Sequence, residues 1–261
     1  MSKASLDNRL KSLRVVDDYA MRGALFDEIF DSFSPTNLYR FCQRLDRGLT
    51  QQTVNARSIV HSLFVHWLET AAQWQNKFDD LPSTPLVAQL RLMSRHGATD
   101  AWKIFDPNDY VFPDDRRLTL GERRARARIP DPDLLEHFLY DPDRIVARHL
   151  LRNSRITHDH VIRMACRRPT TIDALTSIFE SQKFGLSRSV MLAILQNPYA
   201  PYRVAFALAY LLSQTELDQL MKIESLSPNL KGMIGVLYRN RNDALSRRSS
   251  TFRKAMASEE G

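Results

Sequence analysis

The feature that most constrains the fold of this chain is a match of its second half to itself at an offset of 44 residues. Under this offset Leu150-Leu151-Arg152-Asn153 aligns with Ile194-Leu195-Gln196-Asn197, and Val161-Ile162 aligns with Ala205-Phe206. Apolar residues match apolar residues, and an asparagine follows the first stripe in both copies. A fixed period of short helices, each needing a neighbour to bury its apolar face, is typical of a helical solenoid.

Related offsets extend the match. At offset 45, Thr170 aligns with Thr215, and each has an Asp three residues later, which predicts two helix N-caps. A truncated copy at offset 43 brings Asn197 onto Asn240, and a partial copy at offset 27 brings Leu134-Leu135 onto Val161-Ile162. We therefore expect stacked antiparallel helix pairs over residues 118–240.

Asn153, Asn197 and Asn240 each follow an apolar stripe. Asparagine tolerates left-handed backbone better than most residues and is favoured where helices end. We expect Asn153 and Asn197 to adopt that conformation at helix C-termini.

The segment Leu195-Gln196-Asn197-Pro198-Tyr199-Ala200-Pro201 resembles the leucine-rich-repeat-variant and HEAT-like helical repeats of bacterial proteins. The resemblance covers about residues 118–240. It implies a curved right-handed stack of short helices that binds other macromolecules and carries no catalytic residues. The cysteine cluster with which some repeat-variant proteins hold an iron–sulfur centre is absent here, so that property is not carried over.

The N-terminal half has the periodicity of longer helices. Apolar residues recur at three and four from Ile59 to Ala72, while Ser34-Pro35 and Thr84-Pro85 look like helix starts and Gly48 like a helix end. With only 8 glycines in 261 residues, we predict an all-α protein. A helical bundle over residues 1–110 precedes a short α-solenoid of helix-pair repeats over 111–240 and a flexible basic tail over 241–261, with the first junction in the turn-rich segment 106–115.

Other classes of protein find little support. No stretch approaches the ~18 uncharged apolar residues of a membrane span, and no signal peptide is evident. Cys42 and Cys166 lie far apart among apolar residues. We expect two reduced, packed thiols in a soluble cytoplasmic protein, and no cofactor.

Arginines are the best candidates for a binding surface. Residues 111–240 hold 19 Lys and Arg against 14 Asp and Glu, and every basic residue from Arg116 to Arg168 is an arginine. Arg163 and Arg167 form one pair spaced at four, which places both on one face of a helix. The candidate arginine face comprises Arg123, Arg124, Arg126, Arg128, Arg144, Arg148 and Arg152. We expect their guanidinium ends on one exposed surface with acidic residues only at its borders; the alternative is a solvated face balanced by Asp and Glu.

His158-Asp159-His160 is the one dense group of potential metal ligands. His-Asp doublets occur in metal-dependent phosphohydrolases of the HD type, which need further ligands from other helices. His137, His149 and Asp173 could supply them. The simpler interpretation is a helix start, with Thr157 as the N-cap.

The leading hypothesis is a non-enzymatic interaction or scaffold module that binds another protein through an acidic surface of that partner. One alternative is a nucleic-acid-binding protein that uses the Arg116–Arg168 region, to which the tail around Ser246-Arg247-Arg248 could contribute. The other is the HD-type phosphohydrolase.

Overall fold

In the computed structural model, residues 3–51, 53–106, 118–239 and 241 are described, and over these residues the chain is helical. Their only β-type pairing is an isolated bridge between Ala101 and Pro201, so the predicted all-α class is confirmed. The N-terminal helices are α1 (Lys3–Val15), α2 (Tyr19–Ser32), α3 (Pro35–Thr50), α4 (Val54–Asp79) and α5 (Pro85–Ser94).

Local signals explain where these helices begin. Ser34 and Thr84 are N-caps whose hydroxyls accept from backbone amides, and Pro35 and Pro85 occupy the first helical position, as predicted. The predicted end at Gly48 is wrong, because α3 continues to Thr50. A single glycine lowers helix stability without ending a helix whose apolar face is buried.

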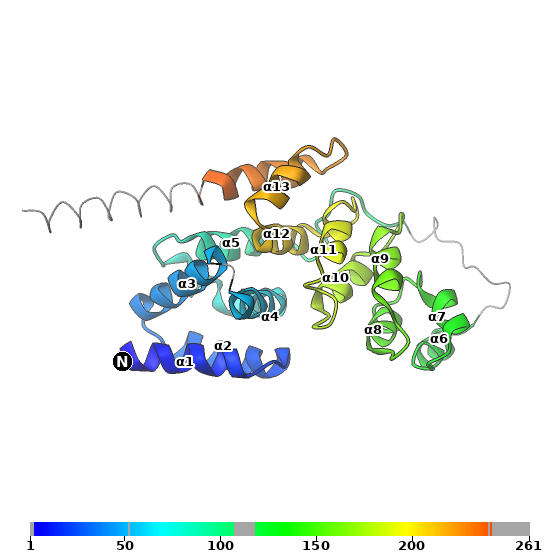
Figure 1. The fold of residues 1–261 in the computed structure, drawn as a ribbon, viewed down its shortest axis with the longest axis horizontal. Coiled ribbons are helices and arrows are strands. Elements are labelled where there is room, and N and C mark those ends of the chain that lie inside the picture. The colour runs from blue at the N-terminus through cyan, green and yellow to red at the C-terminus, as the bar shows by residue number, and fades with distance from the viewer. Residues whose placement is uncertain (1–2, 52, 107–117, 240, 242–261) are drawn as a thin grey trace, which may run out of the picture.

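The second half continues with a projecting stack of short helices (Figure 1). These are α6 (Leu120–Arg126), α7 (Pro132–Phe138), α8 (Arg144–Arg152), α9 (His158–Cys166), α10 (Ile172–Glu180) and α11 (Arg188–Leu195). Helix α8 contacts α10, and α9 contacts α11. Consecutive helices therefore alternate between two layers, and helices two positions apart in the chain are neighbours within a layer.

The offset of 44 residues does not connect helices of one layer. It brings α8 onto α11, which belongs to the other layer together with α9. Neighbours within a layer are closer in sequence, since 28 residues separate Arg144 from Ile172, the first residues of α8 and α10. The partial match at offset 27 is nearer to this spacing. That the stack is built of true repeats stays a prediction.

Asparagine side chains tie neighbouring helices together. Asn153 follows α8, and its side-chain amide donates to the carbonyl oxygens of Ala127 (3.1 Å) and Ile129 (2.9 Å) at the end of α6. The predicted left-handed conformation of Asn153 is wrong, because its φ is −67° and its ψ is 137°. The asparagine is placed there by the hydrogen bonds of its amide, and its backbone is extended.

Asn197, which follows α11, makes the equivalent contacts three helices further on, in the other layer. Its amide donates to the carbonyl oxygens of Ala165 (2.8 Å) and Arg167 (2.9 Å) at the end of α9. The last carbonyls of a helix lack partners within that helix. Each buried asparagine therefore satisfies the C-terminus of the helix two positions earlier, which ends beside it in the same layer.

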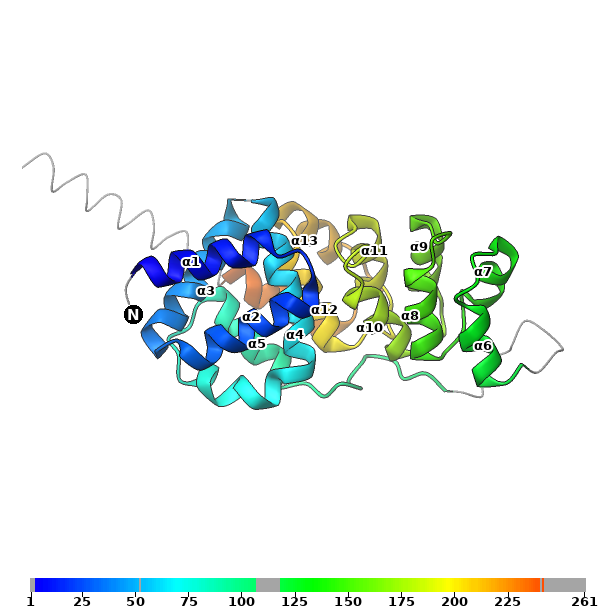
Figure 2. The same ribbon diagram turned by 90° about the horizontal axis from the view of Figure 1, so that it is seen from below.

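Helix α12 (Tyr202–Leu211) brings the chain back to the N-terminal half, where it packs on α4 and α5 (Figure 2). The Tyr210 hydroxyl donates to Asp46 on α3. Helix α13 (Gln214–Met221) and a helix over residues 228–239 follow. Buried apolar residues from Leu6 to Leu237 form one continuous core, so the core crosses the boundary predicted between residues 110 and 111.

Arg241 repeats the function of the asparagines at the end of the last described helix. Its guanidinium donates to the carbonyl oxygens of Tyr210 (2.8 Å) and Leu212 (3.0 Å) at the end of α12. Arg241 lies 44 residues after Asn197 and is therefore the residue that corresponds to Asn197 under the 44-residue offset. Asn240, the predicted third asparagine, lies outside the described residues.

Three smaller expectations are corrected or completed. The N-caps of α10 and α13 are Thr171 and Ser213, and the predicted Thr170 and Thr215 are each displaced from them. Cys42 is buried, whereas Cys166 is exposed and is not a packed thiol. Within the described ranges, no helix has both the length and the apolar character needed to cross a membrane.

Candidate interaction surface

Two of the three arginines of α6 are held by carboxylates that precede α8. Arg123 Nε lies 2.8 Å from Asp141, which is buried. Arg124 makes a two-pronged contact with Asp143, with its Nε and Nη2 at 3.0 and 2.8 Å from the two carboxylate oxygens. The Arg124 hydrogen bonds hold the pKa of Asp143 below its usual range, so this pair persists as an ion pair at neutral pH.

Arg144 and Arg148 share one carboxylate. Each places an Nη2 atom 2.8 Å from an oxygen of Glu180, the last residue of α10. The Glu180 side chain is 13% exposed, whereas the two arginines are 37% and 40% exposed. Two guanidinium groups therefore bind a mostly buried carboxylate and join α8 to α10 within one layer.

These ion pairs overturn the expectation of a single arginine face with acidic residues only at its borders. Four of the seven predicted arginines are bound to carboxylates of the same chain, and Glu180 lies between two of them. The predicted pair Arg163 and Arg167 is also engaged. Arg163 binds Glu136, and Arg167 stacks 4.6 Å above the Tyr140 ring centre. Arg116 lies outside the described residues.

The remaining predicted arginines differ from these. Arg126 lies in the same helix as Glu122. The hydrogen bonds from Thr119 contribute most to lowering the pKa of Glu122, and the positive charge of Arg126 lowers it further. Arg128 donates to the Nε2 atom of His149 at 3.1 Å from Nε. Arg152 ends α8, is exposed, and contacts no carboxylate of the described residues.

Arg155 belongs with Arg128 and Arg152, although sequence reasoning did not select it. The backbone amide of Arg155 donates to the side-chain oxygen of Asn153. The side-chain amide of Asn153 donates to the carbonyl oxygens of Ala127 and Ile129, the two residues that flank Arg128. The ends of α6 and α8 are thus joined at one place. We call the exposed Arg128, Arg152 and Arg155 the basic edge. In the sequence, Arg155 could have been recognised by its position two residues after Asn153, in the turn that this asparagine organises.

His149 reports the electrostatic character of the basic edge. Its pKa is lowered, first by burial and then by the positive charges of Arg128 and Arg152. A neutral imidazole accepts a hydrogen bond from Arg128, which a protonated one cannot do. His149 therefore adds no negative charge to the basic edge, and the nearby Asp143, which raises the pKa of His149, is itself bound to Arg124.

The His158-Asp159-His160 segment begins α9, as the simpler interpretation predicted. Thr157 is the N-cap, and its backbone amide donates to the His160 Nδ1 atom at 3.2 Å in a capping box. His158 packs edge-on against Phe184. The described part of the chain contains no group of three or more His, Cys, Asp or Glu that could hold a metal ion.

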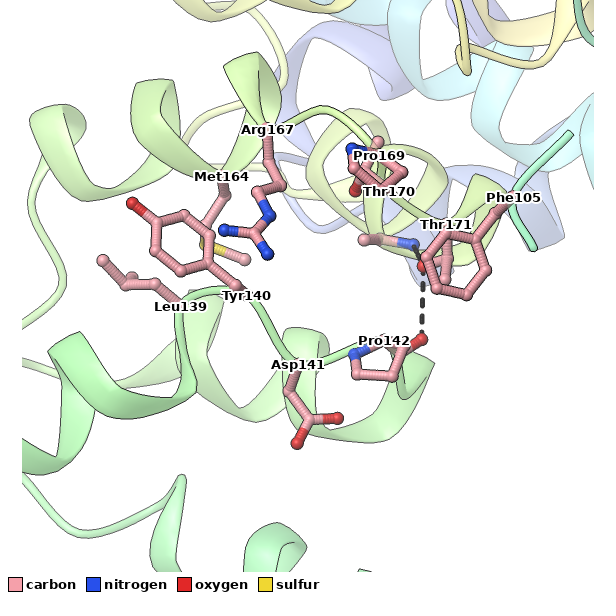
Figure 3. Close-up of a pocket in the computed structure, with 11 residues that line it drawn as sticks. Phe105, Leu139, Tyr140, Asp141, Pro142, Met164, Arg167, Pro169, Thr170 and Thr171 are labelled. Atoms are coloured by element: carbon pink, nitrogen blue, oxygen red, sulfur yellow. Dashed lines mark hydrogen bonds between the residues drawn. The ribbon is translucent and has the colours of Figure 1, made fainter. Parts of the chain in front are cut away.

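A small pocket lies between the loop that precedes α8 and the loop that precedes α10 (Figure 3). Tyr140 and Arg167 stack at one end, and the Thr171 hydroxyl donates to the Pro142 carbonyl at 3.2 Å at the other. Its volume is only ≈ 10 Å³. That is room for about one water molecule, so the pocket has no space for a ligand. The contacts around it hold the two loops together.

No family model matches this chain, and neither the curated proteins nor the solved structures compared with it contain a match. The basic edge and its surroundings therefore have to be interpreted from their own geometry.

Proposed function

We propose that this chain is a non-enzymatic interaction module of the cytoplasm, whose helical stack binds the acidic surface of another protein through the basic edge. The observation that carries the proposal is the contrast between two sets of arginines. Six arginines of the stack form ion pairs with carboxylates of the same chain, namely Arg123, Arg124, Arg144, Arg148, Arg163 and Arg188. Arg128, Arg152 and Arg155, by contrast, are exposed without a described carboxylate partner. Guanidinium groups are well suited to bind carboxylates.

The setting of the basic edge supports a preformed surface. The Asn153 bridge fixes the ends of α6 and α8 relative to each other, with bonds of 3.1 and 2.9 Å. Arg128 is held against His149, so part of its rotamer entropy is already lost before a partner binds. Preorganised groups bind with a smaller entropic penalty.

Nucleic acid binding is the second candidate, because guanidinium groups also bind phosphates. A duplex-binding surface typically makes about 6–10 phosphate contacts. The basic edge offers three guanidinium groups, and ion pairs within the chain occupy most of the others. This small number favours a protein partner.

The test is partner capture with the immobilised full chain, with and without nuclease. An edge variant carries Arg128→Glu, Arg152→Glu and Arg155→Glu. A control variant carries Arg40→Glu, Arg47→Glu and Arg95→Glu, which reverse three exposed arginines of the N-terminal half. We expect the wild type and the control to retain the same acidic proteins after nuclease treatment, and the edge variant to lose them. Equal retention by all three chains would refute the proposal, and loss on nuclease treatment would point to nucleic acid.

A further inference from the structure

A cleft of about 140 Å³ lies where the helical stack meets the N-terminal half, between α4, α8, α10 and the start of α12. About 10–15 Å³ of such volume holds one water molecule, so the cleft has room for a small organic molecule. Its apolar lining includes Leu68, Ile172 and Val204. This cleft lies apart from the basic edge and makes no use of its residues.

Arg203 brings a poorly compensated charge to the cleft. Burial lowers the pKa of its guanidinium, and no carboxylate of the described residues forms an ion pair with it. Its one hydrogen bond is from Nη2 to the Trp67 carbonyl at 3.2 Å, and its Nε is buried without an acceptor. Arg203 is half-buried, and charges withdrawn from water in proteins are normally paired, because an unpaired one is costly. Arg203 therefore has unused donors at a cleft wall.

Arg144 lines the cleft from α8. Its Nη2 binds Glu180 at 2.8 Å, but its Nε is also buried without an acceptor. Two guanidinium groups on different helices therefore line the same cleft, although the buried Nε atoms themselves are closed off from a ligand.

Carboxylates and apolar groups complete the lining. Asp173, at the start of α10, and Glu69, on α4, are exposed at the cleft, and neither forms an ion pair within the described residues. The cleft therefore presents an unpaired cation, unpaired anions and apolar side chains within one small volume.

We propose that this cleft binds a small zwitterion of the free amino acid class. The ligand carboxylate is bound by Arg203, the ligand ammonium by Asp173 and Glu69, and the ligand side chain packs on Leu68 and Val204. A molecule with only one kind of charge would leave either the guanidinium or the carboxylates without a partner. A zwitterion of this size satisfies both.

The test uses the purified full chain with each of the protein amino acids in turn at millimolar concentration. Thermal shift identifies binders, and calorimetric titration measures affinity. For the best binder, the acid lacking the amino group and the amine lacking the carboxyl group are titrated as matched analogues. The variants are Arg203→Met and Asp173→Asn, with Arg40→Met as the control, because Arg40 is exposed on α3, which contributes no residue to the cleft.

We expect Arg203→Met and Asp173→Asn each to weaken amino acid binding by about tenfold or more, the effect of losing one charge-assisted hydrogen bond. Asp173→Asn should leave the affinity for the deaminated acid unchanged, and Arg40→Met should change neither affinity. If Arg203→Met fails to fold, as judged by circular dichroism, Asp173→Asn decides, since Asp173 is exposed. Absence of binding by any amino acid, or equal affinity in the Asp173→Asn variant, would overturn the proposal.

Discussion

The side-chain amide of Asn197 donates a hydrogen bond of 2.8 Å to the carbonyl oxygen of Ala165, which joins the end of α11 to the end of α9. Asn153 makes the same kind of bond to Ala127 at 3.1 Å, between α8 and α6. Both asparagines are buried. These bonds define how neighbouring helices of one layer are aligned at their C-terminal ends.

Asn153→Ala and Asn197→Ala should each lower the free energy of unfolding by about 1–3 kcal/mol, because buried carbonyl groups lose their donors. Asn76→Ala, at an exposed site on α4, is the control and should change it by less than about 0.5 kcal/mol. Urea unfolding followed by circular dichroism measures these differences. Losses at Asn153 and Asn197 as small as at Asn76 would show that the bridges do not stabilise the stack.

The asparagine positions also illustrate how far sequence reasoning reached. The all-α class and the proline-initiated helices followed from local patterns, because caps and apolar stripes are properties of short segments. The 44-residue match singled out Asn153 and Asn197, but for a left-handed backbone that Asn153 does not have. The extended backbone of Asn153 did not follow. Its acceptors lie 24 and 26 residues earlier in the chain, and no local propensity encodes such a contact.

Gly185 should tolerate no side chain. A Cβ atom added there would lie 2.3 Å from the Phe179 carbonyl oxygen and 2.7 Å from the His61 ring. Gly185→Ala should therefore lower the free energy of unfolding by about 1–3 kcal/mol, the usual cost of overpacking. Gly232→Ala, in the helix over residues 228–239, is the matched control, because a Cβ added there meets nothing within 4 Å. It should raise stability by about 0.5–1 kcal/mol. A neutral Gly185→Ala in chemical denaturation would contradict the packing described.

His61 should make the fold sensitive to acid. It is buried, with its Nδ1 2.6 Å from the Tyr19 hydroxyl, and burial lowers its pKa from 6.5 to about 3. Between these values the unfolded chain binds a proton that the folded chain does not, so stability falls as pH decreases from 6.5 towards 3. A His61→Phe variant should show a shallower fall in urea midpoint over that range. An unchanged slope would count against a neutral buried His61.

Asp46 should act in the opposite direction. Burial raises its pKa from 3.8 to about 6, although Tyr210 donates to it. The folded chain then holds a proton that the unfolded chain releases, so stability falls as pH rises from 3.8 to 6. Asp46→Asn removes this opposing contribution and should make the acid-induced loss steeper than in the wild type. A slope unchanged from the wild type in the same urea titrations would rule this out.

Arg148 and Arg152 should respond differently to charge reversal. Arg148 pairs with Glu180 at 2.8 Å, so Arg148→Glu should lower the free energy of unfolding by about 1 kcal/mol, a value limited by the exposure of the arginine. Arg152→Glu should change it by less than about 0.5 kcal/mol. It should, however, raise the pKa of His149, which Arg152 now lowers. Nuclear magnetic resonance titration of His149 measures that shift. An unchanged His149 pKa in the Arg152→Glu variant would show that Arg152 does not lie close to His149.

The candidate site was only partly predictable for the same reason as the fold. Helical spacing showed that Arg144, Arg148 and Arg152 share one face. It could not show that Glu180, 36 residues after Arg144, would occupy that face. Which arginines remain available is decided by packing between helices, and a charge count along the sequence does not contain that information.

The most direct test of the proposed interaction is hydrogen–deuterium exchange of the full chain, alone and with the acidic protein recovered by capture. We predict that the partner slows exchange in residues 126–130 and 152–157, which surround the basic edge, and leaves exchange in α4 and α5 unchanged. The edge variant should show no slowing at the same partner concentration. Protection confined to α1–α5, or equal protection in the edge variant, would contradict the account.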